Sequence, residues 1–86
     1  MTYRLRITAP AQRRLHRLPD RVAVAIVEFI TVVLPGNPAR VSKPLSGRLE
    51  GLRSARRGDY RVLFWIDEDD SRVVVVRVGH RTDVYR

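Results

Sequence analysis

Cysteine is absent from this chain of 86 residues, and histidine occurs only twice, as His16 and His80. Without thiols the chain has neither disulfides nor thiolate metal sites, and two histidines are too few for a histidine-rich metal site. No apolar run approaches the roughly 18 residues that span a membrane, and the first residues, MTYRLRITAP, lack the apolar core of a secretory signal. We therefore expect a cytoplasmic protein that carries no metal or cofactor.

Acidic residues and lysine are also scarce. The chain has 17 Lys+Arg against 9 Asp+Glu, a net charge of +8, and Lys43 is its only lysine. Arginine presents a planar fork of donors that binds phosphate and stacks on bases, so this bias favours a nucleic-acid partner. A GC-rich genome also produces arginine-rich proteins, so composition alone leaves the function open.

The hydrophobic content of 44% and the charged content of 30% are typical of a folded chain rather than a disordered one. The length suits one domain with a small core, so we predict a single domain over residues 1–86. Apolar periodicity and turn residues predict the order β-α-α-β-β-β. The predicted elements are strands at 3–7, 52–56, 60–67 and 72–78 and two helices that end at Leu18 and Leu34.

Consecutive strands joined by short turns pair antiparallel, and helices cover one face of such a sheet. We therefore predict an α+β fold, a mostly antiparallel twisted sheet with a helical hairpin packed on one face. The segment 39–51 is predicted to be a loop. The second helix supplies the main apolar stripe, at Val22, Ile26, Phe29, Ile30, Val33 and Leu34.

Alternation along the strands divides their side chains between two faces. The residues expected to face the helices are Tyr60, Val62, Phe64 and Ile66. Arg61 then lies on the opposite, open face. Strict alternation in the last strand gives two groups, Val74, Val76, Val78 and His80 against Val73, Val75, Arg77, Gly79 and Arg81. If Arg77 and Arg81 share the face of Arg61, arginines from two neighbouring strands converge there.

Charge is distributed unevenly along the chain. The segment 40–61 contains seven basic residues and two acidic ones, for a net charge of +5. By contrast, the turn at 67–70 consists of four consecutive carboxylates. This separation predicts a polyanion-binding face with a solvated far end.

Each candidate residue also has a purely structural explanation. Arg61 can form a surface ion pair with Asp59 or Asp83, and such pairs usually contribute little. His80 can be an ordinary surface histidine, and Tyr85 can be a packed anchor near the C-terminus. These residues become informative only as a group.

Three segments together resemble the RelE branch of the RelE/ParE toxin superfamily, the toxin halves of bacterial toxin–antitoxin pairs. They are SARRGDYRVLFWID at 54–67, VGHRTDVY at 78–85, and KPL at 43–45 followed by LEGLRSARRG. The resemblance covers nearly the whole chain. It implies a ribosome-dependent endoribonuclease that cuts mRNA in the A site without a metal.

In that reaction the ribose 2′-OH attacks the adjacent phosphate, which requires a base, cations for the developing charge and an acid. The family's motif arginines match Arg61 and Arg81, which would hold the scissile phosphate. The family's C-terminal tyrosine matches Tyr85, which would orient the 2′-OH or stack on the base. The residues expected to bind RNA are Lys43, Arg53, Arg56, Arg57 and Arg77.

The chain departs from the family's pattern on the strand before the turn, where Leu52 and Ser54 stand in place of lysines. Arginine does not readily give up a proton, so the nearby arginines cannot replace a lysine base. His80 is therefore the expected proton carrier and joins the catalytic group, with Glu50 as the second candidate.

The resemblance also implies partners: a short, partly acidic antitoxin that covers the basic surface, the ribosome, whose rRNA would contact the same face, and mRNA. A heterotetramer of toxin and antitoxin would bind operator DNA. Two alternatives remain, a ParE-type toxin that poisons DNA gyrase and a noncatalytic nucleic-acid-binding module. The group of Arg61, His80, Arg81 and Tyr85 favours the nuclease, because a gyrase poison needs no phosphate-and-proton cluster.

Overall fold

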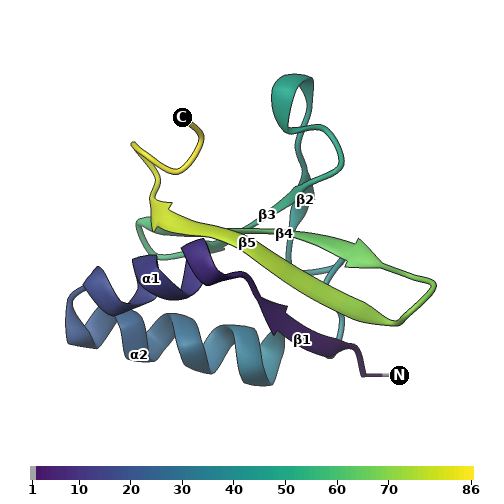
Figure 1. Ribbon diagram of the computed structural model, residues 1–86, viewed down its shortest axis with the longest axis horizontal. Coiled ribbons are helices and arrows are strands. Elements are labelled where there is room, and N and C mark those ends of the chain that lie inside the picture. Colours follow the sequence, from purple (N-terminus) through teal and green to yellow (C-terminus); the bar gives the residue numbers. More distant parts are fainter. Residues whose placement is uncertain (1) are drawn as a thin grey trace.

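In the computed structural model, which describes residues 2–86, two helices cover one face of a five-stranded sheet (Figure 1). The strand order is β1-β5-β4-β3-β2; β1 runs parallel to β5, and all other neighbours are antiparallel. The predicted α+β fold is confirmed. The elements are β1 (Arg4–Ile7), α1 (Ala9–Arg17), α2 (Asp20–Glu28), η1 (Phe29–Val33), β2 (Lys43–Pro44), η2 (Gly47–Leu49), β3 (Arg53–Arg57), β4 (Tyr60–Asp67) and β5 (Arg72–His80).

The strand bounds agree with prediction to within two residues, except for β2. The predicted loop at 39–51 is wrong in part, because Lys43 and Pro44 pair with Ser54 and Arg53 of β3. A strand of two residues is too short to produce an alternating pattern that sequence reasoning can recognise. This pairing places the chain's only lysine beside the sheet.

The second helix ends in a π-helical turn. The helix α2 continues into η1, where the backbone N–H of Leu34 donates to the carbonyl of Phe29 at 2.9 Å. The extra residue in such a turn rotates the residues after it, so Leu34 is fully buried while Val33 is 44% exposed. The predicted core position of Val33 is therefore wrong, whereas those of Ile26 and Ile30 are confirmed.

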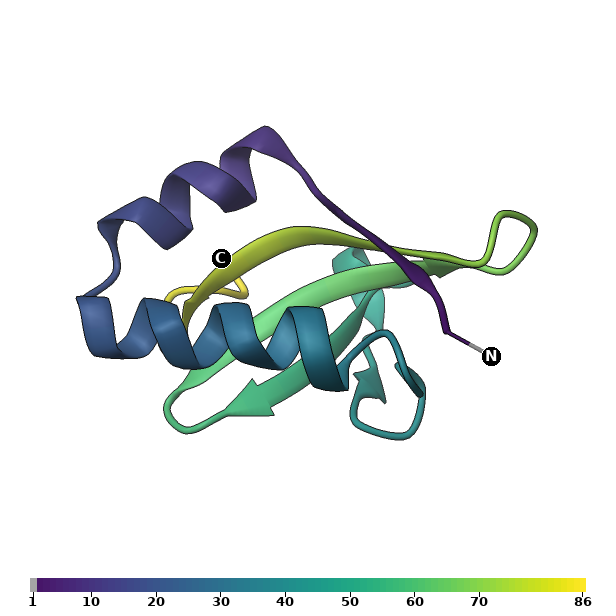
Figure 2. The same ribbon diagram turned by 90° about the horizontal axis from the view of Figure 1, so that it is seen from below.

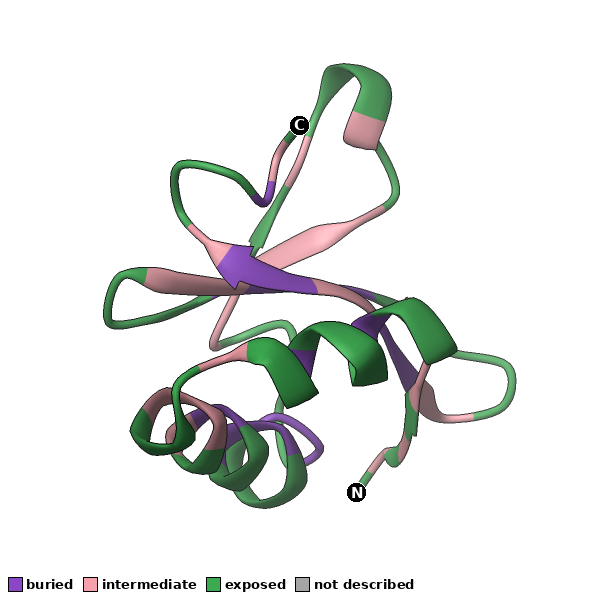
Figure 3. Cartoon of the chain, turned by 60° about the vertical axis from the view of Figure 1, so that its left-hand side comes forward, coloured by how far each residue is buried: buried purple, intermediate pink, exposed green. Residues whose placement is uncertain are grey.

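The core lies between the helices and the sheet. Figure 2 views the molecule from the helix side, with α2 in front of the strands. Figure 3 places the buried residues on the central strands and on the sides of the helices next to them. The predicted helix-facing residues of β4 all belong to this core or pack against it. No helix in the described part of the chain is long and apolar enough to cross a bilayer.

Strand β5 contains a β-bulge at Val76. Leu63 pairs with Arg77, whereas the next β4 residue, Phe64, pairs with Val75, so Val76 has no partner on β4. An extra residue reverses the alternation that follows it. Val75 therefore faces the helices, while Arg77 faces away from them with Leu63.

The bulge corrects the predicted grouping of the last strand. Val73 and Val75 belong to the core under the helices, whereas strict alternation had placed them on the side of Arg77. Gly79 pairs with Arg61, so both lie on the face away from the helices. Arg77 does share the face of Arg61, but because of the bulge rather than by strict alternation.

The contribution of the core helix can be tested with two neighbouring residues. Ile30 is fully buried, whereas Val32 in the same turn is 70% exposed. We expect Ile30→Ala to lower the free energy of unfolding by about 2–5 kcal/mol and Val32→Ala to change it by less than about 0.5 kcal/mol. Urea denaturation followed by circular dichroism measures both, and equal losses would contradict the core assignment.

A hydrogen bond near the N-terminus predicts a pH dependence. The hydroxyl of Tyr3 donates to Oε1 of Glu68 at 2.6 Å, and this bond, with desolvation and the charge of Glu68, raises the pKa of Tyr3 above 10.0. A raised folded-state pKa stabilises the fold below the unfolded-state pKa, and this stabilisation is lost as pH rises through the folded-state pKa. Tyr3→Phe should therefore have a lower free energy of unfolding than the parent below about pH 10, and this difference should shrink as the pH rises through the raised pKa of Tyr3. Urea denaturation at several pH values measures the difference, and a difference that grows at higher pH would contradict the prediction.

Candidate functional site

The sheet face away from the helices is bounded by two segments. In Figure 1, residues 81–86, which we call the C-terminal tail, rise at one end of this face, and the segment with β2 and η2 rises at the other. Leu63, at the centre of β4 on this face, is fully buried. The expected open face is therefore covered at its centre, and a hollow remains between the bounding segments.

This hollow, which we call the open-face cleft, has a volume of about 560 Å³. Lys43 of β2 lies opposite Ser54 of β3, and Arg56 of β3 lies opposite Arg61 of β4. Residues directly opposite each other in antiparallel strands have neighbouring side chains on one face. The residues that line the cleft are Arg40, Val41, Ser42, Lys43, Pro44, Leu45, Ser54, Arg56, Arg61 and Tyr85.

The cleft is strongly basic. Four of its lining residues are cationic and none is acidic. Within residues 2–86, the side chains of Lys43 and Arg56 have neither an ion-pair partner nor a hydrogen-bond partner. A bound anion would relieve the repulsion among these cations, so the cleft is suited to a phosphate group.

Arg61 forms no ion pair with any residue from 2 to 86. Asp59 and Asp83, the two alternatives that the sequence allowed, pair instead with Arg81 and Arg86. Nη1 of Arg61 donates to the carbonyl oxygens of Gly58 and Tyr60, at 3.0 Å each. A guanidinium has five N–H donors, so its other nitrogens remain available to a ligand in the cleft.

Tyr85 enters the cleft from the tail. Its hydroxyl lies 2.8 Å from Oγ of Ser54, which occupies a position where the family pattern has lysine. Lys43 lies opposite Ser54 on the neighbouring strand β2. An amine and a phenol hydroxyl thus flank the same serine, although β3 itself carries no lysine.

His80 lies outside the cleft. It pairs with Tyr60, whose ring packs toward the helices, and the two rings meet edge to face with centroids 5.4 Å apart. Nδ1 of His80 accepts the backbone N–H of Thr82 at 3.2 Å and lies 2.9 Å from its hydroxyl. The proton carrier expected from the sequence therefore stands on the helix side of the sheet. Glu50 is exposed and also absent from the cleft lining.

Arg81 is absent from the cleft lining and contacts Asp59 in the turn between β3 and β4. Its backbone N–H donates to the carbonyl of Asp59 at 2.8 Å, and its Nε lies 3.7 Å from the Asp59 carboxylate. Both side chains are mostly exposed, at 60% and 72%. Exposed pairs contribute only about 0–1 kcal/mol, so Arg81 can leave Asp59 for a phosphate at little cost.

Three of the arginines expected to bind RNA have structural contacts elsewhere. Arg53 donates to the hydroxyl and carbonyl of Ser42 and to the carbonyl of Ala39, which fixes the segment before β2. Arg57 lies over the ring of Phe29 at 5.6 Å, on the helix side. Arg77 donates to the backbone of the C-terminal tail.

Among the cleft residues that sequence reasoning did not single out, Ser54 and Arg40 bear most on its chemistry. Ser54 has the same strand parity as Arg56, which was a usable signal, but its role depends on contact with Tyr85. Arg40 was counted in the basic segment without being singled out. Its place in the cleft follows from the pairing of β2, which the sequence did not reveal.

Comparison with known proteins gives a consistent result. Residues 5–85 match a family model described as the ParE toxin of a type II toxin–antitoxin system. The chain is 50% identical over 86 residues to Toxin RelG of Mycobacterium tuberculosis, covering 100% of this chain and 99% of that protein. It is also 50% identical over 84 residues to Toxin RelE of the same organism, covering 98% and 87%.

Solved structures of toxin–antitoxin complexes also resemble this chain. A chain of the toxin–antitoxin complex RelBE2 from M. tuberculosis has a TM-score of 0.90 at 48% identity, with 94% of this chain and 100% of that chain covered. A chain of the archaeal RelE–RelB complex from Pyrococcus horikoshii has a TM-score of 0.74 at 28% identity, with 98% and 100% covered.

Arg56 and Arg57 are neighbours on opposite faces of β3 and provide a matched test of the cleft. Each Ala substitution removes one positive charge, but only Arg56 lines the cleft. We expect Arg56→Ala to weaken binding of a short single-stranded RNA and to lower the log–log salt slope by about 0.7. Arg57→Ala should leave the slope unchanged. Fluorescence anisotropy at several salt concentrations measures both, and equal slopes for the two variants would argue against the cleft.

Proposed function

Because the chain belongs to the RelE family within the RelE/ParE superfamily of type II toxins, we propose that it is a ribosome-dependent mRNA endoribonuclease. The observation that carries this proposal is the open-face cleft, in which four cations and one phenol hydroxyl meet without a competing carboxylate. A site that cuts RNA needs this combination of phosphate binding and proton transfer.

The proposed reaction is an internal displacement at phosphorus. The 2′-oxygen attacks the adjacent phosphorus, the bond to the 5′-oxygen breaks, and the products are a 2′,3′-cyclic phosphate and a 5′-hydroxyl. Negative charge grows on the phosphate oxygens as the bond forms. Arg61 and Arg56 would stabilise this charge from within the cleft, and Arg81 would join them from outside the cleft lining.

Two protons must move in this reaction, one from the 2′-hydroxyl and one to the 5′-oxygen. Arginine does not give up its proton readily, so Lys43 and Tyr85 are the lining residues suited to proton transfer. Because both flank Ser54, both can reach one phosphodiester. In this proposal they take the role that the sequence had suggested for His80.

An antitoxin is the protein partner that we propose. The RelBE2 and archaeal structures are complexes of toxin with antitoxin, and this chain resembles both. The helical segments also expose four valines, which a protein partner could cover. They are Val24, Val27, Val32 and Val33. Since the proposed substrate is translated mRNA, the site of action would be the cytoplasm.

The second candidate is a gyrase poison of the ParE type. It is favoured by the description of the matching family model, which names ParE. Such a toxin would arrest growth through gyrase-linked DNA breaks and would leave mRNA intact. The two candidates therefore differ in the nucleic acid that is damaged.

Primer extension on a reporter mRNA after induction of the chain tests the proposal. We expect cuts within codons when the message is translated, and none when its start codon is removed. Tyr85→Phe, which removes one hydroxyl, should reduce cutting by about 10²-fold or more, and Arg61→Ala by a similar factor. Tyr3→Phe, which removes a hydroxyl far from the cleft, is the matched control and should cut normally.

Growth arrest with intact mRNA and broken DNA would support the gyrase poison instead. If Arg61→Ala and Tyr85→Phe both cut as strongly as the parent, the result would support the nuclease but contradict its assignment to the open-face cleft.

A further inference from the structure

We propose that Arg77 is a positioning residue that holds Tyr85 at the open-face cleft by fixing the C-terminal tail on both sides of it. The effect on cleavage rests on the proposed function, whereas the effect on the tail does not. The sequence placed Arg77 among the RNA-binding residues, but Arg77 is absent from the cleft lining.

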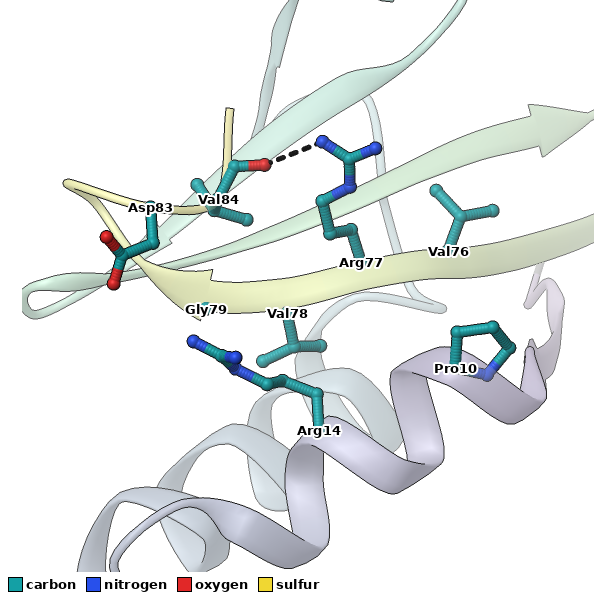
Figure 4. A pocket seen from close by; sticks show the side chains of 8 residues that line it. All are labelled: Pro10, Arg14, Val76, Arg77, Val78, Gly79, Asp83 and Val84. Carbon is teal, nitrogen blue, oxygen red and sulfur yellow. Dashed lines mark hydrogen bonds between the residues drawn. The ribbon is translucent and has the colours of Figure 1, made fainter. Parts of the chain in front are cut away.

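The contacts of Arg77 bracket Tyr85. Its Nη1 donates to the backbone oxygens of Val84 and Arg86, at 2.9 Å each, and these residues immediately precede and follow Tyr85 (Figure 4 shows the first bond). Hydrogen bonds from a charged donor are stronger than neutral ones. The base of the Arg77 side chain is fixed in turn, since Arg77 pairs in the sheet with the fully buried Leu63.

Packing holds the tail at only one residue. Of residues 81–86, Val84 alone is buried, and it lies over Gly79. A second pocket of about 450 Å³ adjoins this region, and Figure 4 shows Arg77 rising from β5 toward the tail while Arg14 approaches from α1 on the other side. Because most residues of the tail are exposed, its order depends strongly on polar contacts.

Apart from the bond between its hydroxyl and Ser54, Tyr85 is held only weakly by the other contacts of the tail. The amides of Asp83 and Val84 both donate to the carbonyl of His80, which forms the turn that begins the tail. Arg48 reaches the carbonyl of Tyr85 only at 3.5 Å. The two bonds from Arg77, at 2.9 Å each, are shorter than this contact from Arg48 and bind the tail backbone on both sides of Tyr85.

Amide hydrogen exchange tests the fixing of the tail without any assay of activity. In Arg77→Met we expect the amides of Asp83, Val84 and Arg86, which are hydrogen-bonded in the parent, to exchange about tenfold faster. Arg72→Met is the matched control, because Arg72 lies on the same strand and its side chain forms an ion pair with exposed Asp70 at 3.6 Å, away from the tail. Equal exchange in the parent and Arg77→Met would overturn the proposal.

A double-mutant cycle tests whether Arg77 acts through Tyr85. In the parent, Arg77→Met should lower kcat with little change in KM. In a Tyr85→Phe background, the same change should lower kcat by less than about threefold, because the hydroxyl that it positions is already gone.

An undiminished further loss of activity in the Tyr85→Phe background, together with a raised KM, would make Arg77 a direct RNA ligand and overturn the proposal. If the parent cuts no RNA at all, the proposed function fails, and the exchange measurement alone decides whether Arg77 fixes the tail.

Discussion

The β-bulge at Val76 is the constraint on which both the core and the candidate site depend. Before the bulge, Val73 and Val75 point into the core, and strict alternation would carry Arg77 into the same apolar layer. A buried, unpaired guanidinium is strongly destabilising. One extra residue turns Arg77 to the other face, so the same strand packs Val73, Val75 and Val78 in the core and contacts the tail through Arg77.

The two faces of the sheet separate residues that are neighbours in the sequence. Arg56 reaches the cleft, while its neighbour Arg57 lies over Phe29 on the helix side. Gly79 faces the cleft side with Arg61, while His80 meets Tyr60 on the other. The catalytic group expected from the sequence was therefore a mixture of two faces. Arg61 and Tyr85 line one cleft, whereas the sheet register places His80 on the other face.

Much of the fold followed from local patterns. The bounds of β4, the facing of its apolar residues and the position of Arg61 came from simple alternation, because β4 contains no irregularity of its own. The wrong predictions, for the facing of β5, the position of Val33 and the loop that contains β2, come from local irregularities. The bulge and the π-helical turn each insert a residue that shifts the register, and a strand of two residues is too short to show an alternating pattern. The preferences that place all three are tertiary. The tail was also beyond local reasoning, because its path depends on bonds from Arg77.

The central claim is that phosphate binds on the cleft face of the sheet. Its most direct test is the ¹⁵N NMR of the arginine Nε–Hε groups during titration with a short RNA that is 2′-O-methylated and so cannot be cleaved. The account predicts that the signals of Arg56 and Arg61 shift, while those of Arg53 and Arg57 stay in place. Shifts confined to Arg57, together with movement of the His80 ring signals, would place the RNA on the helix side and contradict the account.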